Sequence, residues 1–236
     1  MAVTEKERVK TWERGEHLLL LPARVEERPE SIKDIQRFYM VLSPGNRERF
    51  RLAVIGGKRL PEPGHKGQRF WGFVDLVRKS PASLRDELSG DQYRTKTRSE
   101  RHVPAARPAG EGVYRLLRHG GHTHLVYALE LPKEPGEVQE ELRIEPEASY
   151  TISVKNPEAP SPRGVGLRPS ERAELPKSLM EVFRGRRFAE ADPPELLDRE
   201  GADLVLIAAA EDLKEEMGSP WTPRRRMPSM PTFSPS

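Results

Sequence analysis

The chain has 236 residues, of which 35% are hydrophobic, 33% are charged and only 6% are aromatic. This composition excludes a generically disordered chain, and the length suits one sizeable domain or two small ones. The absence of cysteine excludes disulfide bonds, thiolate zinc sites and cysteine nucleophiles. Most of the 40 basic residues are arginine and 23 residues are proline, which is compatible with a thermostable protein.

No targeting or membrane segment is visible in the sequence. The N-terminal stretch, MAVTEKERVKTWERGEH, lacks the apolar region of a signal peptide. The longest apolar runs, HLLLL and LVLIAAA, are much shorter than the roughly 20 residues that a membrane-spanning helix needs. We therefore expect a soluble, cytoplasmic protein without a membrane partner.

The first two thirds of the chain predicts β-strands. Each candidate is short, rich in Val, Ile, Leu, Phe or Tyr, and bounded by Gly, Pro, Asn or Ser. The expected strands are His17–Leu21, Arg37–Leu42, Phe50–Ile55, Arg69–Arg78, Val113–His119, His122–Leu131 and Tyr150–Lys155.

Two short helices are expected between these strands. In SPASLRDELSG, Ser80 can cap the helix and Pro81 fits its first position, while Leu84 and Leu88 share a face. The segment PGEVQEELRI repeats that spacing with Val138 and Leu142.

The C-terminal third is organised differently. A Pro-rich connector over residues 156–172 separates the β-rich body, residues 1–155, from a helix–helix–strand segment over residues 173–218. That segment is too small to bury enough apolar surface alone, so we expect it to dock on the β body within one domain. Residues 219–236, rich in Pro and Ser, are expected to form a disordered tail.

The two helices of that segment are predicted from spacing and capping. Leu175, Leu179 and Phe183 would line one face of the first helix. Asp192 would cap the second, and DLVLIAAA would follow as a buried strand. We therefore expect an α+β fold with a mainly antiparallel sheet, because hairpin-length links do not suit parallel pairs. Closure of that sheet into a barrel is one possible arrangement.

A β-hairpin is predicted in the segment RHGGHTHLVYALELP. The Gly-Gly pair suits a two-residue loop, which sets His119 opposite His122 and Leu117 opposite His124. One face is then apolar and is expected in the core; it consists of Tyr114, Leu116, Leu125, Tyr127 and Leu129.

The three histidines of this hairpin fall on the opposite face. Neutral imidazoles at His119, His122 and His124 could converge on one Zn²⁺ and leave a position open for a nucleophilic water. No carboxylate adjoins them, however, and histidines on an exposed strand face are common. A solvated hairpin tip is therefore the competing interpretation.

Two basic, Gly-containing loops are candidate sites for an anionic ligand. The first, Gly56–Arg69, carries Lys58 and Arg59. The second runs from Lys96 to Glu111, and its candidate ligand-binding residues are Lys96, Arg98, Arg101, His102, Arg107 and Glu111. Small residues let backbone approach a ligand, and Arg binds phosphate or carboxylate through two nitrogens. The competing interpretation is a flexible basic connection.

The sequence FWGF follows the first loop. Trp71 and Phe73 beside Lys66 and Arg69 could stack nucleobases on a β surface, but their alternation favours a place in the core. The sequence FRGRRF is a further basic cluster, which we interpret as the end of a helix.

Charge is distributed unevenly along the chain. From Gly45 to Lys79 there are nine basic and three acidic residues, whereas Glu171 to Gly218 has seven basic and thirteen acidic ones. The basic segment could attract an anionic partner, or the two segments could face each other within the fold.

No specific catalytic motif is present, so whether the protein is an enzyme stays open. The sequence favours a binding module for nucleic acid or a phosphate-bearing ligand, without a cofactor. The alternative is a metal-dependent hydrolase that uses zinc at His119, His122 and His124.

Overall fold

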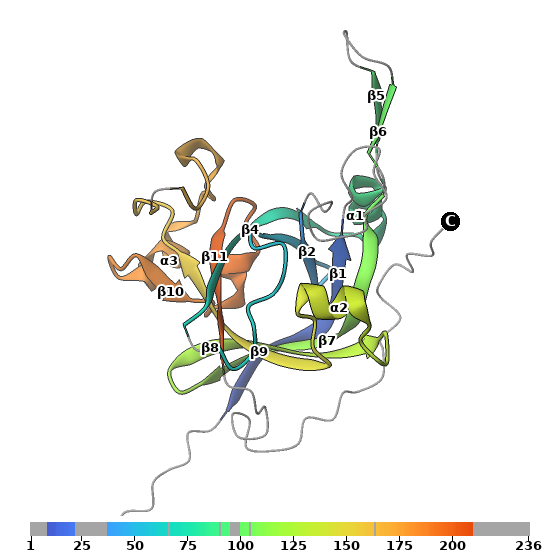
Figure 1. Ribbon diagram of the computed structural model, residues 1–236. Helices are drawn as coiled ribbons and strands as arrows, with labels where there is room; N and C mark the ends of the chain where they lie inside the picture. Colours follow the sequence, from blue (N-terminus) through green and yellow to red (C-terminus); the bar gives the residue numbers. More distant parts are fainter. Residues whose placement is uncertain are drawn as a thin grey trace, which may run out of the picture.

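The computed structural model describes residues 9–21, 37–65, 67–89, 91–94, 100–103, 105–162 and 164–209. Its centre is an antiparallel sheet that closes into an eight-stranded barrel (Figure 1). In order around the barrel, the strands are β1 (Lys10–Leu21), β2 (Tyr39–Pro44), β3 (Phe50–Ile55), β4 (Arg69–Arg78), β11 (Asp203–Ala208), β9 (Glu147–Lys155), β8 (His122–Leu131) and β7 (Arg107–His119). Pairing of β7 with β1 completes the ring.

The other elements are small. Strand β10 (Phe188–Glu190) pairs with the end of β9, and β5 (Asp91–Arg94) with β6 (Glu100–Val103) forms a hairpin that projects from the barrel (Figure 1). The helices are α1 (Pro81–Leu88), α2 (Glu137–Leu142) and α3 (Lys177–Met180). Among the described helices, none has the length and apolar character needed to cross a membrane.

The fold is therefore mainly β, which corrects the α+β expectation. The predicted strands are present, and β3, β4 and β8 have the predicted bounds. The predicted cap of α1 is also confirmed, because the N–H of Ser83 donates to Ser80 Oγ at 3.2 Å. The strands missing from the sequence interpretation are β5, β6 and β10.

The predicted C-terminal helices are the main error. The first shrinks to α3 and a 3-10 turn, Glu181–Phe183, which ends at Arg184 in the left-handed region. The second is a 3-10 turn, Pro194–Leu197; Pro193 rather than Asp192 takes the cap position, because a residue that precedes a proline is kept extended. The predicted tail, residues 219–236, lies outside the described residues.

The described part of the C-terminal segment, residues 173–209, packs on the barrel. Leu179, Phe183 and Val205 are all buried, and the first two belong to the main core cluster. Strand β11 does more than cover an edge, because it closes the barrel between β4 and β9.

The barrel interior is filled by side chains. Tyr114, Tyr127 and Tyr150 are fully buried there, and the space left among the central aliphatic side chains is about 10 Å³. One water molecule needs about that volume or more, so the interior is a packed core. A binding site must therefore lie on the outside or at an end of the barrel.

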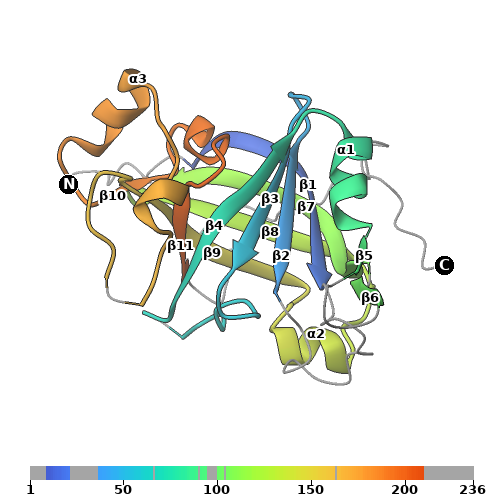
Figure 2. The same cartoon turned by 90° about the horizontal axis from the view of Figure 1, so that it is seen from above.

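The antiparallel order gives the barrel two ends. The loop after β3, the start of β7 and helix α2 lie at one end, which we call the α2 end. The β7–β8 turn, the loop between β2 and β3, and residues 156–202 lie at the other, which we call the hairpin end. Figure 2 shows α2 and α3 on opposite sides of the barrel.

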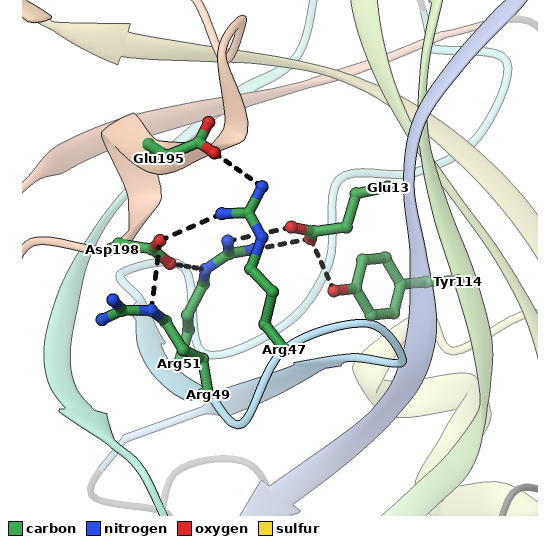
Figure 3. Close-up of polar contacts among 7 residues, drawn as sticks. All are labelled: Glu13, Arg47, Arg49, Arg51, Tyr114, Glu195 and Asp198. Carbon is green, nitrogen blue, oxygen red and sulfur yellow. Dashed lines mark hydrogen bonds and ion pairs between the residues drawn. The ribbon is translucent and has the colours of Figure 1, made fainter.

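A buried ion-pair network closes the hairpin end (Figure 3). Arg51 of β3 is 1% exposed and donates to both carboxylate oxygens of Glu13, at 2.6 and 2.9 Å. Its Nε donates to Asp198 Oδ1 at 2.7 Å, and the hydroxyl of Tyr114 donates to Glu13 at 2.7 Å. Because Asp198 follows the 3-10 turn of the C-terminal segment, this network joins that segment to the barrel.

More exposed arginines extend the network. Arg47 contacts Glu195 at 2.6 Å and Asp198 at 3.4 Å, and Arg78 contacts Glu200 at 2.6 Å. The basic segment Gly45–Lys79 and the acidic C-terminal segment thus face each other, which confirms the second interpretation of the charge pattern.

Removal of Arg51 should be costly. Arg51→Ala leaves the carboxylate of Glu13 buried without its cation, and we expect a loss of about 3–5 kcal/mol in the free energy of unfolding. Arg47→Ala, which removes a partly exposed arginine from the same network, should cost about 1 kcal/mol or less. Urea denaturation measures both. Equal effects of the two substitutions would contradict a dominant role for Arg51.

A second buried ionisable group lies inside the barrel. The ring of His17 is 2% exposed and lies 4.9 Å from the ring of Tyr127, centroid to centroid. Burial lowers the pKa of His17 from 6.5 to about 3. The folded barrel therefore holds the neutral imidazole.

This shift predicts acid sensitivity. Between about pH 6.5 and pH 3 the unfolded chain binds a proton at His17 and the folded chain does not, so stability falls as the pH falls through that window. The slope is at most about 1.4 kcal/mol per pH unit. His17→Phe should lose this contribution. Urea unfolding at several pH values tests it, and identical pH slopes for the two proteins would refute it.

Candidate functional site

Trp71 and Phe73 lie on the outer face of β4, where both are partly exposed. The sequence correctly predicts that they share a side, but their expected place in the core is wrong. The inward positions belong to Phe70, Gly72 and Val74, and Gly72 is tightly enclosed. A Cβ there would meet Val54 O and the Leu204 side chain, so the strand turns its smallest residue inward and two large rings outward.

These rings form one wall of a surface hollow of about 330 Å³, which we call the aromatic hollow. The strand segment Arg69–Phe73 and the loop Gly164–Leu167 line it, and Gly56 and Asp203 complete the lining. The volume lies near the lower limit of typical small-molecule sites, which is about 300 Å³.

The indole of Trp71 is held by a second ring. Phe188 of β10 meets it edge-on, with 5.8 Å between centroids and 61° between the planes. Such pairs contribute about 0.5–1.5 kcal/mol beyond the area they bury. The contact keeps a partly exposed indole in one orientation, which a stacking platform requires.

A buried ion pair fixes the base of the hollow. Lys155 Nζ lies 4.0 Å from Asp203 Oδ2, and Asp203 Oδ1 accepts the N–H of Leu167 at 3.1 Å. Burial raises the pKa of Asp203 and lowers the pKa of Lys155. Lys155 also donates to the carbonyl of Ala159 at 2.7 Å, so the pair holds both ends of the connector loop.

Arg172 holds that connector in its folded path through several hydrogen bonds. Its guanidinium donates to the carbonyls of Pro157, Ala159 and Leu167 and to Ser161 Oγ, at 3.0 to 3.3 Å. Arg172, together with Lys155 and Asp203, therefore holds the described parts of the connector, of which residues 164–167 line the hollow.

The hollow presents a positive charge to solvent. Among the described residues, its charged lining residues are Arg69 and Asp203. Arg69 is exposed, whereas Asp203 is 3% exposed and lies beside the Lys155 ammonium. An incoming ligand therefore meets an aromatic surface and a guanidinium.

The predicted anion-binding residues lie elsewhere. Lys58 and Arg59 follow β3 at the α2 end, and Arg107 and Glu111 lie on β7, which is separated from β3 by the two strands β2 and β1. The side chains of Arg101 and His102 in β6, and all of Lys96 and Arg98, lie outside what the structure describes. A shared anion site for this set therefore stays a prediction.

Acidic residues also surround the first loop. The N–H of Leu60 donates to the carbonyl of Leu142 at 3.0 Å, which ties the loop to α2 and its glutamates, Glu137, Glu140 and Glu141. Arg143 contacts Glu62 of the loop at 3.1 Å. These carboxylates reduce the attraction of the loop for an anion, and anion binding at Lys58 and Arg59 stays a prediction.

The β7–β8 hairpin has the predicted register and buries the predicted apolar pairs. Its histidines have different surroundings. His124 is buried, with Nδ1 3.2 Å from Ser149 Oγ, because β9 pairs along β8. His119 lies 6.0 Å from His124, centroid to centroid, whereas the exposed His122 lies 3.2 Å from Glu190.

Within the described residues, no three side chains of His, Asp or Glu are grouped so that they could hold a metal ion. Zinc at His119, His122 and His124 stays a prediction that no contact favours.

The aromatic hollow is not predicted by the sequence. Its one sequence signal is a glycine between two aromatics in a strand, and the wall opposite comes from a connector whose path no local pattern reveals.

Comparisons of the chain with protein-family models, curated proteins and solved structures found no match.

The two histidine environments can be separated by substitution. His122→Ala should change the free energy of unfolding by about 0.5 kcal/mol or less, since the side chain is exposed. His124→Ala should cost about 1–3 kcal/mol, since it leaves Ser149 buried without this partner. We expect elemental analysis of protein purified without a histidine tag to find no stoichiometric zinc. Retained zinc that His122→Ala abolishes would restore the metal hypothesis.

Proposed function

We propose that this protein is a binding module for single-stranded nucleic acid. One nucleobase stacks on Trp71 in the aromatic hollow, and Arg69 holds an adjoining phosphate. The observation that carries the proposal is the outward orientation of Trp71 and Phe73 beside an exposed arginine. Base stacking on an aromatic side chain is worth about 1–3 kcal/mol per base and tolerates any sequence.

The loop opposite Trp71 suits a flat ligand. Gly164 and Gly166 have φ values of 81° and 79°, a region that favours glycine, and neither carries a side chain toward the hollow. Backbone can therefore approach a stacked base closely. Asp203 Oδ1 already accepts the N–H of Leu167, which fixes this part of the loop before a ligand arrives, and the Lys155 ammonium lies 4.0 Å from Oδ2.

A single exposed guanidinium limits the expected electrostatic contribution. Arg69 is the exposed cation in the described part of the lining, and one neutralised phosphate on a single strand contributes about 0.7 to the slope of log affinity against log salt. Stacking therefore provides the larger share of the binding energy, and binding should persist at moderate salt.

The test is fluorescence anisotropy with a labelled oligonucleotide, as DNA and as RNA. Trp71→Ala should weaken binding about tenfold or more, and Trp71→Phe should retain most of it, because a ring is kept. Arg69→Ala should lower the salt slope by about 0.7. The matched control is Trp12→Phe, since Trp12 is also partly exposed beside a cation, Lys10, but does not line the hollow.

Unchanged affinity in Trp71→Ala would overturn the proposal, as would the absence of binding at low salt. Competition by a free mononucleotide at the same affinity would show that the ligand is a nucleotide and not a strand.

A further inference from the structure

A larger cavity, of about 540 Å³, lies at the hairpin end. The β7–β8 hairpin contributes Arg118 and Thr123, and the C-terminal segment contributes Ser178, Arg184 and Arg186. We call it the arginine cavity. It shares no lining residue with the aromatic hollow.

Two of the three carboxylates that line the arginine cavity are already engaged. Glu190 accepts the N–H of Thr123 at 2.7 Å and lies 3.2 Å from Nδ1 of His122. Asp192 lies 3.7 Å from Arg118. The third, Glu181, is exposed. Asp192 is therefore paired with a cation, and Glu190 is held in place by hydrogen bonds that leave its negative charge unpaired.

Arg184 is the unusual member of the lining. Its φ is 48°, in the left-handed region that favours glycine, at the end of the 3-10 turn Glu181–Phe183. Among the described residues, two others that are not glycine also have a positive φ, Lys58 and Arg143. The Arg143 side chain is engaged there, at 3.1 Å from Glu62 and 3.0 Å from Gln68.

Arg184 has no comparable partner within the described part of the chain; its guanidinium makes no side-chain hydrogen bond or ion pair there. The neighbouring Arg186 is oriented by a hydrogen bond from its Nε to the carbonyl of Phe183 at 3.3 Å, which leaves its two terminal nitrogens available. An unfavourable backbone conformation thus presents one unpaired guanidinium beside a second that is already oriented.

We propose that the arginine cavity binds the phosphate group of a small ligand. Arg184 and Arg186 donate to the phosphate oxygens, and the hydroxyl of Ser178 supplies a further donor. Guanidinium groups match the geometry of phosphate oxygens, and such charge-assisted hydrogen bonds are strong. This site is independent of the proposed nucleic-acid function.

The test uses inorganic pyrophosphate as the probe, titrated into the full chain and followed through backbone amide NMR signals and calorimetry. Arg184→Gly removes the guanidinium and places a glycine where φ is positive, so the variant should unfold at the same or a higher temperature. Its affinity for pyrophosphate should fall about tenfold or more, as expected for the loss of a hydrogen bond to a charged group. Glu181→Gln should bind more tightly than the parent, because it removes an exposed carboxylate from the lining.

Two controls separate a built site from general attraction to a basic protein. Arg187→Ala removes the same charge from an exposed neighbour that does not line the cavity, and should leave the affinity unchanged. Arg143→Gly likewise places a glycine at a position of positive φ, but at the α2 end, and should also leave the affinity for pyrophosphate unchanged.

The shifted amide signals should include those of Thr123 and Ala189, which line the cavity. Absence of saturable binding at low ionic strength, or equal losses in Arg184→Gly and Arg187→Ala, would overturn the proposal. Neither result would bear on the oligonucleotide experiment, whose variants lie in the aromatic hollow.

Discussion

The fold depends on the burial of one guanidinium. Arg51 is withdrawn from water almost completely, which costs several kcal/mol unless its charge and its hydrogen bonds are matched. Glu13 supplies one carboxylate from β1, and Asp198, which lies 147 residues after Arg51 in the chain, supplies the other. Arg51 therefore has both of its carboxylate partners only when the C-terminal segment is in place.

That requirement has consequences for the outer surface. With Asp198 anchored, β11 lies between β4 and β9, and Asp203 at its start meets Lys155 and Leu167. These contacts place the connector opposite Trp71. The ion pairs of Arg51 with Asp198 and of Lys155 with Asp203 therefore help to form the hollow. The packed interior of the barrel supports it as a rigid base.

The sequence predicts much of the barrel because its strands carry local signals. The Gly-Gly pair of the β7–β8 turn determines the register, and short apolar runs bounded by Gly, Pro or Asn mark β3 and β4. Alternation alone, however, cannot tell the inner from the outer face when both sides of a strand are apolar. For Trp71 the deciding factor is the space at Gly72, which depends on strands β3 and β11.

The errors at the C-terminal end have a similar origin. Leu175, Leu179 and Phe183 have helical spacing, but the turn ends at Arg184 and consecutive prolines interrupt the next segment. The charge pattern predicts that the two segments could face each other, yet it cannot identify Arg51 as the buried member. Burial follows from its inward position on β3, beside Glu13 and Tyr114.

The proposed function depends on the partly exposed indole of Trp71. The most direct measurement is the indole N–H signal of Trp71 in protein labelled with ¹⁵N at tryptophan, recorded during titration with an unlabelled oligonucleotide. We predict that the Trp71 signal shifts progressively and saturates, as a base stacks on the ring, while the Trp12 signal stays in place. A Trp71 signal that does not move while the oligonucleotide binds elsewhere would contradict the account.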